Sequence, residues 1–133
     1  GKVITFERNK KHFEILKRNL KLSQFSGQVE LRNEELTDQI ETITCNSIIL
    51  DLPNPQLLVK WAEKSLLIGG KLLCYVPTVN QVENLLKSLN GWSEIEINEM
   101  MHRTWQSRLE AIRPNTSILG HTGFIISARL LFK

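Results

Sequence analysis

A chain of 133 residues is long enough to form one domain with an apolar core, and its contents of 41% hydrophobic and 23% charged residues are ordinary for a globular protein. No apolar run approaches the roughly 20 residues that span a bilayer, which excludes a membrane-spanning helix. The net charge of +3 permits an acidic partner such as RNA without requiring one.

The first third of the chain predicts a strand, a helix and a second strand. Residues 2–6 are expected to be a strand that ends at Glu7, and Asn9 is expected to cap a helix over residues 10–22. A short strand follows at residues 29–32, and residues 36–40 form at most one or two helical turns. The chain begins directly with a strand pattern, so no signal peptide is expected.

The rest of the chain continues this alternation and then departs from it. Residues 47–50 predict a buried strand, followed by a helix that Asn54 caps and that Gly69-Gly70 stops. The next elements are expected to be a strand at 71–76, a helix at 80–89, and strands at 92–100 and 122–132. Alternating strands and helices indicate an α/β fold with a mostly parallel sheet. The last two strands have no clear helix between them and are expected to be antiparallel neighbours.

The two cysteines indicate a reducing compartment. Cys45 and Cys74 lie beside or within apolar strands and have no CxxC partner, so they are expected to be small core residues and not metal ligands. No metal site is therefore expected. The expected location is the cytoplasm, or the nucleus of a eukaryotic cell.

Asp51 stands at the carboxyl end of a buried strand, where open α/β sheets bind their ligands. Pro53 keeps Leu52 extended, and Asn54-Pro55 predicts a helix start. These residues predict a stiff acidic loop at the edge of a crevice. The alternative is that Asp51 only caps an ordinary strand-to-helix turn.

Short motifs follow one another along nearly the whole chain. They are Val3-Ile4-Thr5-Phe6-Glu7, Ile49-Leu50-Asp51-Leu52-Pro53-Asn54-Pro55, Gly69-Gly70-Lys71, Tyr75-Val76-Pro77, Asn80-Gln81-Val82, Arg113-Pro114 and His121-Thr122-Gly123-Phe124. With these motifs the chain resembles the tRNA adenine-N1 methyltransferases that modify position 58 of the T-loop. The Asp-Leu-Pro-x-Pro and Arg-Pro…His-Thr-Gly motifs are specific, whereas the first strand and the Gly-Gly pair are generic to the fold.

The resemblance implies a Rossmann-like class I methyltransferase sheet with strand order 3-2-1-4-5-7-6 and an antiparallel C-terminal strand pair. In that family a glycine-rich loop and the first, central strand would precede Gly1, as would a small β domain. Residues 1–133 are therefore expected to be a partial, C-terminal catalytic domain that lacks the central strand. Alone, this fragment is expected to bind cofactor poorly and to be inactive.

The resemblance also implies S-adenosylmethionine as cofactor and assigns the carboxylates. Asp51 is expected to accept a hydrogen bond from the exocyclic N6 amine of the target adenine, which stabilises the positive charge that develops on the purine, and to lie beside the cofactor. Glu7 would hold the cofactor ribose, and Glu35, in place of the family's usual Asp, would contact its adenine. The alternative for Glu7 is a surface acid before a helix.

Four further residues are expected to face the substrate. Tyr75 would stack on or bound the target adenine, Gln81 would line the same crevice, His121 would contact the phosphate or the base, and Arg113 would bind a phosphate. Each has a structural alternative: a core aromatic, a helix-start polar residue, a structural histidine and, for the arginine, a protein contact.

Three functions are compatible with these residues. The first is methylation of adenine N1 at position 58 of tRNA, with tRNA as partner and a homotetramer or a paralogous subunit as the assembly. The second is a non-catalytic RNA-binding or assembly subunit on the same fold, against which the retained Asp51 argues. The third is a methyltransferase acting on a small molecule. The basic segment with Arg103, Arg108 and Arg113 favours RNA.

Overall fold

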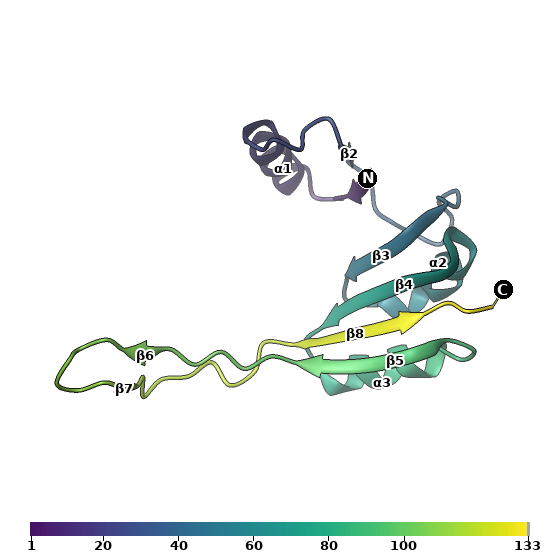
Figure 1. The fold of residues 1–133 in the computed structure, drawn as a ribbon. Helices are drawn as coiled ribbons and strands as arrows, with labels where there is room; N and C mark the ends of the chain where they lie inside the picture. Colours follow the sequence, from purple (N-terminus) through teal and green to yellow (C-terminus); the bar gives the residue numbers. More distant parts are fainter. Residues whose placement is uncertain (133) are drawn as a thin grey trace. The chain divides into compact units, whose positions relative to one another are not determined.

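A computed structural model describes residues 1–132. The chain divides into two compact units, Gly1–Ile40 and Glu41–Lys133 (Figure 1). None of the helices within the described residues has the length and apolarity that crossing a membrane requires.

The first unit contains two parallel strands and one helix. Strand β1, Val3–Phe6, pairs with β2, Val29–Arg32, from Val3 opposite Val29 to Phe6 opposite Arg32. Helix α1, Lys10–Leu22, begins where the Asn9 side chain accepts hydrogen bonds from the backbone N–H groups of residues 11 and 12. The strands, the helix and the Asn9 cap that the sequence predicts are thus confirmed.

Residues 36–40 stay within the expected limit of one or two helical turns and contain no helix. This stretch contains a turn in which the Ile40 N–H donates to the Thr37 carbonyl over 3.3 Å. A single helical turn fixes several residues for one hydrogen bond, so a short segment without a strong cap or an apolar face does not form one.

The second unit is built on a four-stranded sheet with the order β3-β4-β8-β5. Strand β3, Cys45–Asp51, runs parallel to β4, Leu66–Val76, whereas β8, Phe124–Arg129, is antiparallel to β4 and to β5, Ser93–Glu99. The predicted antiparallel pair of final strands is confirmed. The pairings β1-β2 and β3-β4-β8-β5 match the expected segments 3-2 and 4-5-7-6, and a central strand between them stays a prediction.

Helices lie against one face of this sheet (Figure 1). They are the 3-10 helix η1, Pro55–Leu58, and the α-helices α2, Val59–Ser65, and α3, Val79–Ser88. The apolar core forms where alternate strand residues meet the helices, as the two-residue period of a strand requires. Its members include Ile48, Leu50, Leu72, Cys74, Val76, Ile126 and Ala128 from the strands and Leu58, Trp61, Ala62, Val82 and Leu85 from the helices.

The boundary between α2 and β4 differs from the predicted one. The helix ends at Ser65, and β4 already begins at Leu66, so the two glycines lie inside the strand and do not stop the helix. A Cβ on Gly70 would come within 2.8 Å of the Leu67 carbonyl oxygen and 2.9 Å of that of Asn46, so glycine lets β4 approach β3 closely. The side chain of Asn54 makes no cap hydrogen bond with the helix that follows it.

Strand β3 is buried on one face only, which corrects the expectation of a fully buried strand. Ile48 and Leu50 face the helices, but Ile49 between them is 75% exposed. Four consecutive apolar or small residues do not reveal whether one face or both are covered, because both cases give the same short apolar run.

A long two-stranded extension, here called the arm (residues 100–122), connects β5 to β8 and reaches away from the sheet (Figure 1). Its short strands β6, Trp105–Gln106, and β7, Arg113–Pro114, pair antiparallel. Large apolar side chains are exposed along the arm: Met100, Met101, Trp105, Leu109, Ile112, Ile118 and Leu119.

The two cysteines differ in burial. Cys74 is 1% exposed in the middle of β4, and burial raises the pKa of its thiol to about 12. Cys45, at the start of β3, is only partly buried, and the pKa of its thiol is raised by the same cause. Both are free thiols, and Cys74 is a core residue as predicted.

Candidate functional site

A pocket of about 260 Å³ opens at the carboxyl ends of β3 and β4. The parallel strands end side by side, which brings Asp51 into register opposite Tyr75. Six residues from three segments line it, namely Asp51, Leu52, Pro53, Tyr75, Pro77 and Gln81. The location agrees with the rule that ligands bind beyond the carboxyl ends of parallel strands.

Asp51 presents an exposed carboxylate at this pocket. Among residues 1–132 its side chain has no hydrogen-bond or ion-pair partner, so its oxygens can accept bonds from a ligand. The loop behind it is fixed, because Pro55 is fully buried and η1 begins there. The capping alternative predicted for Asp51 does not occur, since η1 has no side-chain cap.

Tyr75 forms one wall of the pocket and is 37% exposed, so it is not a core aromatic. Its hydroxyl donates a hydrogen bond of 2.5 Å to the Thr122 carbonyl. A Cβ on Gly123 would lie 2.5 Å from the Tyr75 ring carbon that bears the hydroxyl and from the hydroxyl oxygen itself. Glycine at position 123 therefore allows the backbone to pass against the Tyr75 ring.

Gln81 lines the pocket, as predicted, but its amide binds within the chain. Its Oε1 accepts from the Thr78 N–H and hydroxyl in a capping box at the start of α3. Its Nε2 donates to the Pro53 carbonyl over 2.9 Å. Gln81 thus ties the loop after Asp51 to the first turn of α3 and shapes the pocket wall.

His121 also binds partners within the chain through both ring nitrogens. Nε2 lies 2.7 Å from the Pro77 carbonyl, and Nδ1 lies 2.5 Å from Oε1 of Glu99. The bond to the carbonyl and then the bond to the carboxylate raise the pKa of His121 above its ordinary value. The predicted contact of His121 with RNA stays a prediction, and its nitrogens would have to leave these partners to make it.

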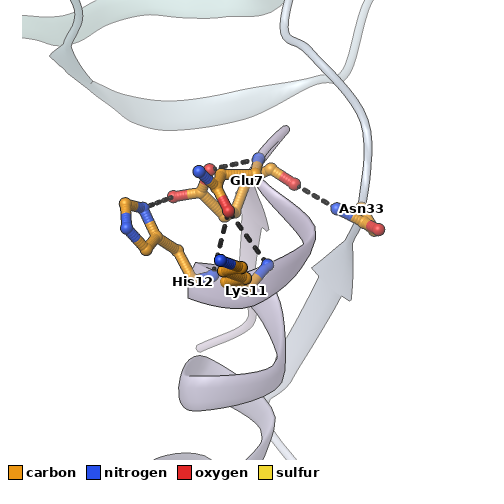
Figure 2. A network of polar contacts seen from close by, with 5 residues as sticks. Glu7, Lys11, His12 and Asn33 are labelled. Carbon is orange, nitrogen blue, oxygen red and sulfur yellow. Dashed lines mark hydrogen bonds and ion pairs between the residues drawn. The ribbon is translucent and has the colours of Figure 1, made fainter.

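A second set of polar groups lies at the carboxyl ends of β1 and β2. The Glu7 carboxylate accepts from the Asn9 N–H over 2.6 Å and lies 3.8 Å from Nδ1 of His12 (Figure 2). The Glu7 carbonyl accepts from the Asn33 side chain over 2.7 Å, which fixes the chain where β1 ends. The side chain remains 26% exposed, so its second oxygen can accept a bond from a hydroxyl group.

Glu35 lies beyond the end of β2 and pairs with Arg8 over 2.8 Å. Both side chains are exposed, so the pair can open to a ligand at small cost. Two carboxylates beyond the ends of paired parallel strands are the acceptors that a ribose and an adenine amine require. The residues of this unit therefore fit the nucleoside part of the expected cofactor.

The three arginines of the arm are exposed. The Arg113 side chain contacts the Gln106 side chain over 3.4 Å across the β6-β7 pair, whereas the guanidinium groups of Arg103 and Arg108 have no partner within the described residues. All three can donate hydrogen bonds to phosphate oxygens.

Two residues near the pocket, Glu99 and Pro77, are not among the site residues that the sequence predicts. Their contacts with His121 join positions 22 and 44 residues apart, and no local spacing predicts such contacts. The glycine of the His-Thr-Gly motif indicates a close backbone approach, but this approach is to Tyr75 and not to Glu99 or Pro77.

Comparisons with known proteins identify relatives over most of the chain. A family model described as the tRNA methyltransferase complex GCD14 subunit matches residues 1–115. The tRNA (adenine(57)-N(1)/adenine(58)-N(1))-methyltransferase TrmI of Methanocaldococcus jannaschii is 27% identical over 98% of this chain and 56% of its own length. The tRNA (adenine(58)-N(1))-methyltransferase catalytic subunit TRM61 of Yarrowia lipolytica is 27% identical over 85% of this chain and 31% of its own length.

A solved structure extends this likeness to the fold. The tRNA (m1A58) methyltransferase TrmI from Aquifex aeolicus has a TM-score of 0.88 and 28% identity, covering 100% of this chain and 55% of that one. The predicted Rossmann-like methyltransferase fold is thereby confirmed. The chain spans between 31% and 56% of the length of these three relatives.

Proposed function

The chain belongs to the family of the tRNA methyltransferase complex GCD14 subunit, and from this membership we propose that the protein methylates N1 of the adenine at position 58 of tRNA. The cofactor is S-adenosylmethionine, and the 133 residues are part of the methyltransferase domain. The family relation alone does not distinguish a catalytic chain from a non-catalytic one. The pocket between Asp51 and Tyr75 is the observation that supports catalysis.

The size of the pocket suits a single base. Its volume of about 260 Å³ is slightly below the range of about 300–1,000 Å³ that is usual for drug-sized ligands. Tyr75 offers an aromatic wall on which a base that has left its stack can rest. The two prolines of the lining, Pro53 and Pro77, add rigid apolar surface. We assign this pocket to the target adenine.

Asp51 orients the base and stabilises the charge that develops on it. When bound, S-adenosylmethionine supplies an electrophilic methyl group. N1 of adenine carries a lone pair at neutral pH, so no residue of the chain has to remove a proton before the methyl group is transferred. The carboxylate of Asp51 accepts a hydrogen bond from the N6 amine, and this bond strengthens as the purine becomes positive. As in the expectation from the resemblance, Asp51 also borders the cofactor.

The nucleoside part of the cofactor is held by the first unit. Glu7 accepts the ribose hydroxyl groups with Oε2, the oxygen that does not bind the Asn9 N–H and that lies 3.8 Å from Nδ1 of His12. Glu35 accepts from the adenine amine after its exposed pair with Arg8 opens. Glutamate has the same acceptor group as the aspartate that is usual in the family and a longer side chain, so it can reach the amine while it stays near Arg8.

The exposed residues of the arm indicate which partners the protein binds. Arg103, Arg108 and Arg113 bind tRNA phosphates, with Arg113 held in place by Gln106. The exposed Trp105, Met100 and Met101 belong to residue types that are enriched in protein interfaces, so the arm also serves assembly with another subunit. That subunit is a second copy or a paralogue.

The test is methylation of a tRNA transcript by the intact protein together with any subunit that purifies with it. We expect incorporation of one methyl group, recovered as 1-methyladenosine at position 58 by nuclease digestion and mass spectrometry. An Asp51→Ala variant that binds tRNA but incorporates no methyl group supports the catalytic role. A wild-type protein that binds tRNA without methylating it would instead support the non-catalytic subunit.

A further inference from the structure

His121 lies at the root of the arm, at the point where three strands of the sheet end. Glu99 is the last residue of β5, where the chain enters the arm, and Phe124 is the first residue of β8, where it returns. Pro77 directly follows β4. The imidazole of His121 contacts all three, with its ring centroid 4.9 Å from that of Phe124.

The contacts of the two ring nitrogens define the protonation state. A backbone carbonyl can only accept a hydrogen bond, so Nε2 must carry a proton toward Pro77. A neutral ring would then direct a bare Nδ1 at the Glu99 carboxylate, which also only accepts when ionised. The arrangement is satisfied when both nitrogens are protonated, and Glu99 is the charged side chain that contacts the ring within residues 1–132.

The residues that follow His121 contact the pocket. The Thr122 carbonyl accepts the hydrogen bond of the Tyr75 hydroxyl, and the Gly123 backbone lies against the Tyr75 ring. Because Tyr75 and Pro77 both line the pocket, His121 is connected to its wall at two points.

We propose that His121 is a positioning residue whose doubly protonated ring ties Glu99 to Pro77 and thereby holds residues 121–123 against Tyr75. The role goes beyond the proposed function, on which it rests only for its effect on methyl transfer. Through His121, the binding of a ligand to the arm is linked to the orientation of the Tyr75 ring.

The link depends on pH in a defined direction. The folded-state pKa of His121 is raised, so the contact that His121 makes between Glu99 and Pro77, here called the tie, is complete below the ordinary pKa of histidine, about 6.5. It is lost as the pH rises through the raised folded-state pKa. The Tyr75 ring therefore becomes less constrained on the alkaline side of that pKa.

Two variants distinguish the tie from the charge on the His121 ring. Glu99→Gln keeps it at every pH, because an amide can accept from a protonated Nδ1 and donate to a bare one. His121→Ala removes it. His102→Ala is the matched control, since His102 lies in the same arm and pairs through its backbone with Leu119.

The test is an NMR titration of the intact protein across pH. It follows the histidine ring signals and the signal of ¹³C-labelled Tyr75. The Tyr75 signal is assigned by its loss in Tyr75→Phe. We expect the Tyr75 signal to shift at the pH at which His121 titrates, this shift to vanish in Glu99→Gln, and His102→Ala to leave it unchanged. In His121→Ala the Tyr75 signal should already have its high-pH position at low pH, and kcat should fall about 10- to 100-fold, as for other small misplacements.

A Tyr75 signal that does not change as His121 titrates, or that is the same in wild type and His121→Ala, would overturn the proposal. These NMR results are independent of activity. A wild-type protein without methyl transfer but with the linked titrations would refute the proposed function and leave the positioning role intact. If His121→Ala does not fold, the Glu99→Gln titration decides.

Discussion

Asp51 on β3 lies directly opposite Tyr75 on the neighbouring strand β4, as its partner in the parallel register. Paired residues of neighbouring strands point to the same face, so a carboxylate and a phenol ring leave the sheet together at the mouth of one pocket. The Tyr75 hydroxyl is occupied by the Thr122 carbonyl, whereas Asp51 has no partner among the described residues. In the proposed function the two side chains therefore have different roles: Tyr75 would supply a fixed surface, and Asp51 would supply the free acceptor.

Replacing Asp51 should slow methyl transfer without loss of cofactor. Asp51→Ala removes the acceptor for the N6 amine, and we expect the activation barrier to rise by about 2–4 kcal/mol. Asp51→Asn keeps an oxygen but loses the charge and should fall between Ala and wild type. Single-turnover kinetics with tRNA measure this effect. Glu96→Gln is the control, an exposed carboxylate of β5 outside the pocket. Near-normal turnover of Asp51→Ala would disprove the assignment.

In the intact full-length protein, replacing Glu7 should weaken cofactor binding more than tRNA binding. Each hydrogen bond from a ribose hydroxyl to the carboxylate contributes about 1.5–3 kcal/mol, so Glu7→Ala should raise the Kd for S-adenosylhomocysteine more than tenfold. The variant also loses the bond from the Asn9 N–H, which Glu7→Gln retains.

Calorimetry for the cofactor and filter binding for tRNA, with thermal unfolding alongside, distinguish these effects. Glu14→Gln, which removes a surface carboxylate of α1 paired with Lys17, serves as control. Equal losses of cofactor and tRNA affinity would point to unfolding of the first unit instead of a ribose contact.

Gly123→Ala should disturb the pocket although alanine is the smallest possible side chain. Its Cβ would lie 2.5 Å from the Tyr75 ring carbon and hydroxyl, so the ring or the backbone must move. We expect a loss of about 1–3 kcal/mol in the free energy of unfolding, as for other overpacked sites, and a lower kcat. Gly120→Ala is a matched control, because a Cβ there meets no atom within 4 Å. Urea unfolding and methylation rates should separate the two variants, and equal behaviour would contradict the close contact.

Neutralising Arg103, Arg108 and Arg113 should reduce the salt dependence of tRNA binding. Each phosphate contact releases counterions, so the slope of log affinity against log salt should flatten by about 2–3 units while cofactor affinity is unchanged. Replacing Lys10, Lys17 and Lys21 of α1 by Gln removes the same charge from another unit and controls for net charge. An unchanged slope with an altered assembly size in light scattering would assign the arginines to subunit contacts.

Local signals predicted the first unit and the ends of several elements correctly. Asn9 caps α1 because its short polar side chain reaches two free N–H groups, and such a cap depends only on neighbouring residues. The start of β4 was missed because Leu66, Leu67 and Ile68 fit a helix pattern and a strand equally well. Pairing with β3, which is a tertiary contact, decides between them.

In the site, too, local signals predict some features, and tertiary contacts decide the others. Asp51 and Tyr75 were found from strand ends and motifs, and the parallel register brings them together. The contacts of His121 with Pro77 and of Gln81 with Pro53 cannot be predicted, because they join residues 44 and 28 positions apart. Sequence could place these residues near the pocket, but it could not show that their polar atoms are already used within the chain.

The burial of Cys74 makes its thiol a probe for the separation of β4 from its neighbouring strands. Burial raises the pKa of the Cys74 thiol to about 12, so the thiol is almost entirely protonated at neutral pH, and the residue lies in the core. A thiol-specific reagent should therefore label the partly buried Cys45 first and reach Cys74 only when β4 separates from its neighbours. The rate at which the second label appears measures how often the wall of the pocket comes apart, and a ligand that fills the pocket should slow it.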